Sequence, residues 1–219
     1  MNATEALPRL EPSALLLANP LIAVLRARDA SDYHAAVEVL AESGVRSIEL
    51  TLTTPGTFEQ LPGLVTRMGS GVEIGVGTVT TADEARRAID GGAKYLVTPI
   101  VNLEVIAVAL KASVPVIPGG LTPTELHAAW IAGATAVKIF PAETVGPQYG
   151  SHLRGPFPSL RFIPSGGVRL EDIPAWLKAG ATAVSLGGPL IGDAMTGGSL
   201  TALGERARRA ATLAAEASR

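Results

Sequence analysis

The chain repeats one pattern eight times, a short apolar run followed by a longer segment with helical features. The apolar runs lie at residues 21–26, 47–52, 73–79, 95–99, 114–119, 136–141, 161–167 and 183–188. The segments at 31–44, 81–92, 122–133 and 170–180 have helical features; several begin at Ser, Thr or Asp and end at glycine, the usual start and stop signals of a helix. Eight such units in 219 residues predict an α/β fold, a (β/α)8 TIM barrel.

An open doubly wound sheet is the alternative, but no GxGxxG motif follows the first run and the units continue evenly to eight. No linker or low-complexity tract divides the chain, so we expect one domain over residues 1–219. Residues 12–19 predict a short N-terminal covering helix. We expect residues 116–120, "VIPGG", to form a turn, and residues 141–160 to form an irregular loop over the C-terminal mouth.

The composition excludes several classes of protein. A formal net charge of −2 argues against nucleic-acid or anionic-membrane partners. The chain has no cysteine, which excludes disulfides, thiolate metal sites and a cysteine nucleophile. No apolar run approaches the roughly 20 residues of a membrane span, and the N-terminus lacks the basic start of a secretory signal. We therefore expect a cytoplasmic protein that acts on small molecules.

Lys138 lies in an apolar stretch, "AVKIFPAE" at residues 136–143, between Val137 and Ile139. Burial disfavours the charged form of an amine and can lower its pKa by several units. A neutral amine is a nucleophile towards carbonyl carbon, as in enzymes that form Schiff bases. The sequence therefore makes Lys138 a candidate catalytic residue.

Other polar residues meet Lys138 at the same end of the strands. Side chains alternate across a strand, so Glu49 in the second run and Lys138 and Phe140 in the sixth face the axis. Arg26 and Thr78 come at the C-terminal ends of the first and third runs, also on the inner face. Active sites of this fold lie at that end. The alternating residues Ile48, Leu50, Leu52, Val137 and Ile139 face the helices.

Each of these residues also has a plainer explanation. Glu49 and Lys138 could form a buried structural ion pair, Arg26 could be a strand-end residue in solvent, and a threonine such as Thr78 is ordinary in a strand. The convergence of four polar side chains from four strands on one mouth favours a functional site.

Two glycine pairs follow the last two runs, Gly166–Gly167 and Gly187–Gly188. In barrels of this class, the loops after strands seven and eight often bind phosphate through bare backbone N–H groups. Two tight turns would account for the same residues, but both pairs at those positions favour a phosphate site.

The histidines offer no metal site. His34 and His127 lie in helical segments, His152 lies in the predicted loop, and no two have ligand spacing. We expect no metal and no organic cofactor.

Seven motifs together resemble the 2-dehydro-3-deoxy-phosphogluconate / 4-hydroxy-2-oxoglutarate aldolases, the class I pyruvate aldolases. The resemblance runs in order from Pro20 to Ile191. The motifs are "AVLR" (23–26), "IELTL" (48–52), "GVGTV" (75–79), "VTP" (97–99), "VIPGGLTPTE" (116–125), "VKIFPAE" (137–143) and "SGGV" (165–168).

The resemblance implies a role for each candidate residue. Lys138 matches the Schiff-base lysine and Glu49 the acid–base glutamate. Thr78 and Pro99 match positions that line the pyruvate pocket, and Phe140 matches a residue beside the imine. The four glycines at 166, 167, 187 and 188 match the loops that hold a distal phosphate. The family is usually a homotrimer, which the resemblance implies for this chain.

The expected reaction is the cleavage of a 2-keto-3-deoxy sugar acid, 2-dehydro-3-deoxy-6-phosphogluconate or its galacto epimer, to pyruvate and an aldehyde. Two residues depart from the phosphogluconate branch: Thr53 stands where that branch has arginine, and Pro189 where it has serine. Arg26, in contrast, matches an arginine of the phosphogalactonate branch. The alternatives are a 4-hydroxy-2-oxoglutarate aldolase, a phosphate-binding isomerase or synthase without a Schiff base, and an inactive sugar-acid binding module.

Overall fold

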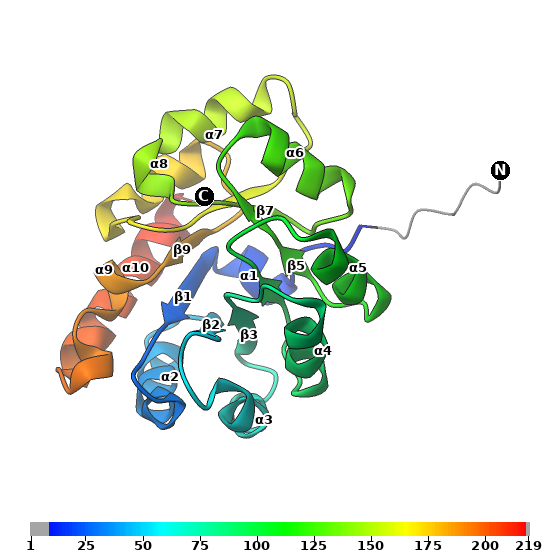
Figure 1. The fold of residues 1–219 in the computed structure, drawn as a ribbon. Helices are drawn as coiled ribbons and strands as arrows, with labels where there is room; N and C mark the ends of the chain where they lie inside the picture. The colour runs from blue at the N-terminus through cyan, green and yellow to red at the C-terminus, as the bar shows by residue number, and fades with distance from the viewer. Residues whose placement is uncertain (1–8, 218–219) are drawn as a thin grey trace.

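The structure, a computed structural model, describes residues 9–217. All strand pairs in this part of the chain are parallel, and helices surround them (Figure 1). The strands are β1 Leu21–Leu25, β2 Ser47–Thr51, β3 Glu73–Gly77, β4 Leu96–Val97, β5 Val116–Ile117, β6 Gly119–Gly120, β7 Val137–Ile139, β8 Phe162–Pro164 and β9 Val184–Leu186.

The strands form two sheets, with the orders β5-β4-β3-β2-β1-β9 and β6-β7-β8. The predicted turn at residues 116–120 is wrong, because β5 and β6 are both sheet segments, separated by Pro118. Proline has no N–H to continue the ladder. The α/β prediction with parallel strands is confirmed. Within residues 9–217, no strand pairing joins β8 to β9 to close the sheets into a ring.

Helices follow the strands in nearly every unit. They are α1 Ala14–Ala18, α2 Tyr33–Glu42, α3 Thr57–Met68, α4 Ala82–Asp90, α5 Leu103–Lys111, α6 Pro123–Ile131, α7 Pro147–Arg154, α8 Ile173–Lys178, α9 Gly188–Ile191 and α10 Leu200–Ala217. Short 3-10 turns lie at η1 Ala30–Asp32, η2 Ala142–Thr144, η3 Leu170–Asp172 and η4 Ala194–Thr196. Capping boxes begin α4, from Thr81 to Glu84, and α6, from Thr122 to Glu125.

The prediction of an irregular loop at residues 141–160 is wrong in part, since α7 occupies its middle. Glycine and proline suggested a loop, but each has a helical position here. Pro147 is in the first turn, where no N–H is needed. Gly150 faces the ring of Phe162, which a Cβ at that position would approach to 2.4 Å.

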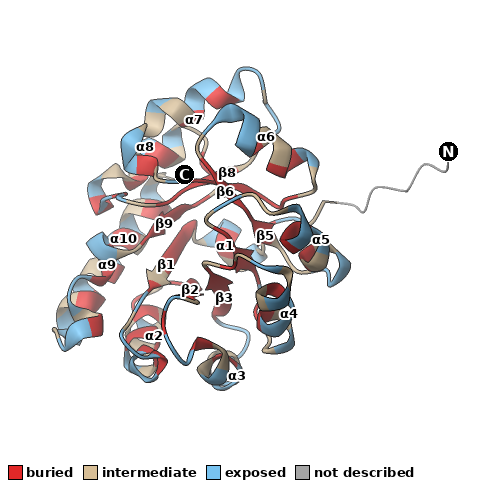
Figure 2. Ribbon diagram, viewed as in Figure 1, coloured by how far each residue is buried: buried red, intermediate tan, exposed pale blue. Residues whose placement is uncertain are grey.

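The core has two parts, separated by the strands. Outward side chains such as Ile48, Leu50 and Ile139 pack under the helices. Inward side chains, among them Ile22 and Ile163, form a smaller cluster on the axis. Figure 2 shows the strands almost entirely buried, whereas the helices expose their outer faces.

The short helix α1 lies among the strands rather than in the outer layer of helices (Figure 1). Its Leu16 packs into the axis cluster beside Tyr95 and Ile117. The predicted covering helix at residues 12–19 is therefore present, with Ser13 as its N-cap. Among the described residues, α1 thus fills one end of the axis.

No helix in residues 9–217 is both long and apolar enough to cross a membrane. Residues 1–8, on which the expectation of no secretory signal partly depends, lie outside the described residues.

Candidate active site

A pocket of about 470 Å³ opens at the C-terminal ends of the strands; we call it the mouth pocket. Its volume is that of a small-molecule site. All ten residues that the sequence singled out line it: Arg26, Glu49, Thr78, Pro99, Lys138, Phe140, Gly166, Gly167, Gly187 and Gly188. They come from seven different strands or the turns after them, so only the assembled fold brings them together.

Lys138 lies in the middle of β7, between Gly119 of β6 and Ile163 of β8. Its side chain faces the axis and is only 8% exposed. Burial lowers the pKa of Lys138, the charge of Glu49 raises it, and the cation of Arg26 lowers it further. The net effect favours a neutral amine, the form that attacks a carbonyl carbon.

Glu49 lies in β2 and is 1% exposed. Burial raises its pKa, against the opposing effects of Lys138 and Arg26. A carboxyl group with a raised pKa can serve both as a proton donor and, once ionised, as a proton acceptor. Its oxygen Oε2 is buried without a hydrogen-bond partner, as expected of a group kept for a substrate, a water or another donor.

Gly77 of β3 makes the space for Glu49. A Cβ at residue 77 would lie 1.8 Å from Glu49 Oε1 and 2.4 Å from Cδ. The "GVGT" motif thus has a steric reason, since any side chain at this position would displace the carboxyl group.

Among the described residues, no ion pair within 4.0 Å joins Lys138 to Glu49. The two side chains nevertheless line the same small internal space beneath the mouth pocket and shift each other's pKa. The alternative of a direct structural ion pair is therefore wrong. A proton passing between the two groups needs a bridging water or a substrate oxygen.

Phe140 lies with its ring centroid 4.6 Å from Lys138 Nζ. An aromatic face attracts a cation at this distance, so the ring favours a positive nitrogen such as a protonated imine. Gly166 provides the room for the ring, since a Cβ there would lie 2.9 Å from two of the ring carbons.

Thr78 follows β3 with φ of +60°, a left-handed conformation that is unfavourable for a β-branched residue. Thr78 and Pro99 both border the mouth pocket. Arg26 is exposed at the rim, close enough to influence the pKa of both Glu49 and Lys138. Cation, hydroxyl and ring atoms therefore surround the space next to the amine.

The two glycine pairs differ in what surrounds them. A Cβ on Gly167 would lie 2.1 Å from the carboxylate of Glu143, so that acid covers the first loop. Gly188 has nothing within 4 Å of a Cβ position and leaves the second loop open. Pro189 follows it at the start of α9 and brings no N–H to a bound anion.

Sequence reasoning missed part of the lining. Thr51, two residues after Glu49 in β2, is buried, lines the pocket and donates a hydrogen bond to Leu25 O at 3.0 Å. Met195 and Thr196 reach the pocket from η4, and no sequence pattern marked them. Thr53 is exposed and does not line the pocket.

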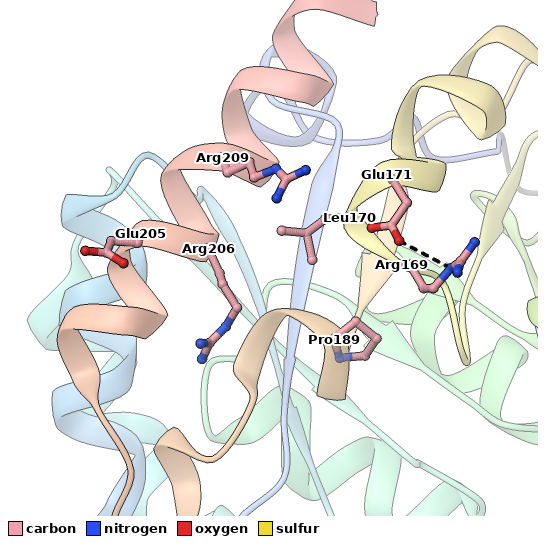
Figure 3. Close-up of a pocket in the computed structure, with 7 residues that line it drawn as sticks. All are labelled: Arg169, Leu170, Glu171, Pro189, Glu205, Arg206 and Arg209. Carbon is pink, nitrogen blue, oxygen red and sulfur yellow. Dashed lines mark ion pairs between the residues drawn. The ribbon is translucent and has the colours of Figure 1, made fainter.

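A second hollow of about 500 Å³ lies on the outer side of α9 and shares Pro189 with the mouth pocket. Figure 3 shows it between α9, α10 and the segment that contains Arg169 and Glu171. Arg206 is occupied there, donating to Leu190 O at 2.6 Å and Ile191 O at 2.7 Å. Arg169 lies 3.6 Å from Glu171. No lysine lines the hollow, whereas Lys138 and Glu49 both line the mouth pocket, so we assign the chemistry to the mouth pocket.

Within residues 9–217, no group of three or more His, Asp or Glu side chains is arranged to hold a metal ion. The three histidines lie on helices, in α2, α6 and α7.

The fold and the pocket define a class of enzyme. A buried amine with a lowered pKa, a carboxyl group with a raised pKa and an aromatic ring that favours an iminium ion are the parts that an imine-forming, class I aldolase requires.

The family follows from comparison with known proteins. Residues 13–200 match the family model for KDPG and KHG aldolase, the aldolases of 2-dehydro-3-deoxy-6-phosphogluconate and 4-hydroxy-2-oxoglutarate. The chain belongs to this family and is a carbon–carbon lyase.

Similar proteins have names that agree with the family. The 2-dehydro-3-deoxy-6-phosphogalactonate aldolase of Escherichia coli K12 is 35% identical over 172 residues, 78% of this chain and 84% of that one. A solved structure described as native KDPGal superposes with a TM-score of 0.86 at 32% identity, covering 95% of this chain and 98% of that one. KDPG aldolase from Legionella pneumophila, solved with pyruvate as a covalent carbinolamine, has a TM-score of 0.81 at 26% identity over 89% and 95% of the two chains.

Proposed function

We propose that Lys138 forms a Schiff base with C2 of a 2-keto-3-deoxy-6-phospho sugar acid and that Glu49 carries the protons. The products are pyruvate and glyceraldehyde 3-phosphate. One observation carries the proposal: burial lowers the pKa of the only lysine in the pocket, beside a carboxyl group whose pKa burial raises.

The reaction begins when the neutral amine attacks C2 and the resulting carbinolamine loses water, with Glu49 supplying the proton that the leaving hydroxyl takes. The ionised Glu49 then removes the proton of the C4 hydroxyl, directly or through a water. The C3–C4 bond breaks, its electron pair flows into the iminium ion, and the aldehyde departs. The enamine takes a proton at C3, and water hydrolyses the imine to pyruvate and free Lys138. Acid–base help of this kind contributes about 10²–10⁴ in rate.

The other residues orient the substrate. Arg26 and Thr78 bind the carboxylate at C1, and Pro99 closes the pyruvate side of the pocket. Phe140 stabilises the positive iminium ion from 4.6 Å. The distal phosphate meets the backbone at Gly166, Gly167, Gly187 and Gly188. Lys138 itself provides the electron sink, so the reaction requires no organic cofactor or metal.

Borohydride reduction in the presence of pyruvate tests the covalent step. The native protein should gain a stable adduct on Lys138, located by mass spectrometry of peptides. Lys138→Ala should gain none, and Lys138→Arg, which keeps a cation, should also be inactive. A native protein that pyruvate leaves unmodified would show that the Schiff-base mechanism is wrong.

A smaller substrate, 4-hydroxy-2-oxoglutarate, is the second candidate. Two features at the far end of the pocket favour it, since the carboxylate of Glu143 covers Gly167 and Pro189 brings no N–H. Pyruvate release from this acid, from both phosphorylated epimers and from the unphosphorylated acids decides between the candidates. Membership of the aldolase family disfavours the isomerase, synthase and binding-module alternatives.

We also infer that the two sheets form one (β/α)8 TIM barrel and that residues 1–219 form one domain. In support, β5 and β6 are successive segments of one run, and Thr182 N donates to Phe162 O at 2.9 Å between the other two sheet ends. We propose that the protein is cytoplasmic and forms a homotrimer. Light scattering on the purified protein tests the trimer directly. A nucleic-acid or membrane partner is not part of the proposal.

A further inference from the structure

Two buried polar atoms beneath the mouth pocket have no hydrogen-bond partner, the hydroxyl of Tyr95 and Oε2 of Glu49. Tyr95 is 3% exposed and Glu49 is 1% exposed. Buried hydroxyl and carboxyl groups are nearly always paired, so each of these two atoms without a partner calls for an explanation. The sequence patterns gave Tyr95 no role beyond the fourth apolar run.

The inner face of β3 has no side chains where Tyr95 and Glu49 lie, because residues 75 and 77 are glycines. A Cβ on Gly75 would meet the Tyr95 ring at 2.3 Å, and one on Gly77 would meet Glu49 Oε1 at 1.8 Å. Alternate residues of a strand share a face and, in a parallel sheet, lie about 6.6 Å apart. The phenol and the carboxyl group therefore occupy successive levels on the axis, with the phenol below, and two glycines accommodate them.

A second acid lies below the phenol. Glu73 is buried at the start of β3 and accepts a hydrogen bond from Ser47 Oγ. Burial raises the pKa of Tyr95, and the charges of Glu49 and Glu73 raise it further. The hydroxyl therefore keeps its proton and can donate it in a hydrogen bond. Of the two acids, Glu49 has the buried oxygen that lacks a partner.

We propose that Tyr95 is a positioning residue whose hydroxyl donates a hydrogen bond, directly or through one water, to Glu49 Oε2 whenever that carboxyl group is ionised. The proposal rests on the acid–base role proposed for Glu49. Glu49 gives up its proton at a position that is only 1% exposed, and its charge then needs a donor that is already in place. A hydrogen bond to a carboxylate is stronger than one to the neutral acid. Tyr95 thus favours the ionised state and fixes the orientation of the carboxyl group.

Tyr95→Phe removes the hydroxyl and keeps the ring. In the imine complex the Lys138 amine no longer titrates, so the acid limb of the kcat–pH profile reports Glu49. Loss of a hydrogen bond to a carboxylate should move that limb upward by about one pH unit. On the acid side of the profile kcat should fall about tenfold, while KM stays unchanged. Borohydride should still trap pyruvate on Lys138.

Tyr33→Phe is the matched control. Tyr33 is also fully buried, but its hydroxyl lies under the helices, near Thr51 O at 3.4 Å and Thr57 Oγ1 at 3.5 Å. The same chemical change there should leave the acid limb in place. Incorporation of 3-fluorotyrosine at position 95 gives a measurement that survives a folding defect of the phenylalanine variant. Its more acidic hydroxyl is a stronger donor and should move the limb downward.

The outcomes are distinct. A Tyr95→Phe enzyme that traps pyruvate and keeps the native acid limb overturns the role of Tyr95 alone, and so does a fluorotyrosine enzyme with an unmoved limb. A native enzyme that traps no pyruvate overturns the Schiff-base mechanism, and the positioning role with it. Opposite shifts in the two variants support the proposal.

Discussion

Gly77→Ala is the smallest change that tests the geometry of the site. The added methyl group would lie 1.8 Å from Glu49 Oε1, 2.4 Å from Cδ and 2.6 Å from Cγ. Residue 77 does not have a positive φ, so alanine fits the backbone and only the contact with Glu49 is disturbed. No other side chain is among the three atoms nearest to the new methyl group.

The size of the effect follows from the distance. An ordinary contact begins at 3.4 Å, so the carboxyl group must move by about 1.5 Å from its present position. A misplacement of about 1 Å can cost 10²-fold in rate, and loss of general acid–base catalysis costs about 10²–10⁴. We expect kcat to fall by about 10²–10⁴ and the free energy of unfolding by about 1–3 kcal/mol, the usual cost of overpacking.

The assay is pyruvate release coupled to lactate dehydrogenase, with urea unfolding measured in parallel. Gly63→Ala is the control, because Gly63 lies in α3 with nothing within 4 Å of the added Cβ. It should keep full activity and gain about 0.5–1 kcal/mol of stability from the better helix former. A Gly77→Ala enzyme with native kcat would refute the placement of Glu49, and with it the reason given for the glycine.

Three further predictions concern the same pocket. Burial holds the pKa of Lys138 in the folded protein below its usual 10.5. The buried cation therefore lowers the free energy of unfolding by its full amount at pH values below that lowered pKa. This destabilisation decreases as the pH rises towards 10.5. Lys138→Met should therefore raise the free energy of unfolding by about 0.5–2 kcal/mol at pH 7 and by less at pH 10 in urea titrations; equal gains would contradict the lowered pKa. Thr78→Gly relieves the strain of a φ of +60° and should stabilise the fold by about 1 kcal/mol in thermal unfolding. It should also lower kcat/KM, whereas Thr78→Ser should keep the activity. A glycine variant less stable than the native protein would argue against backbone strain at Thr78. Glu143→Gln removes the charge over Gly167 and should raise kcat/KM for phosphorylated over unphosphorylated substrate by about two- to fivefold, less at high salt; an unchanged ratio would place the phosphate elsewhere.

The sequence was sufficient to predict the alternation of strands and helices and the inward direction of Lys138 and Glu49. Side chains alternate strictly between the two faces of a strand, so a polar residue in an apolar run shows which neighbours share its face and which lie on the opposite one. The helix starts at Thr81 and Thr122 were equally clear, because the start signals of a helix depend on residues a few positions apart in the chain. All three features are local.

The errors came from glycine and proline, whose meaning depends on their surroundings. Residues 116–120 have the composition of a turn but form two strand segments, and α7 lies in a predicted loop. In both places the neighbours decide: Gly119 packs against the backbone of residues 98 and 99, and Gly150 against Phe162. No single-chain pattern reports a neighbour that is distant in sequence.

The sequence by itself thus determined which residues are the candidates for the chemistry, since burying an amine and an acid in apolar strands leaves them few other uses. Only the tertiary structure decided how their side chains are arranged. It separates Lys138 from Glu49 by more than an ion-pair contact, provides space for the acid over Gly77, and puts the Tyr95 ring over Gly75 on the level below. These features depend on distances between strands, which are set when the sheets assemble and the side chains pack, and the order of residues along one strand does not contain them.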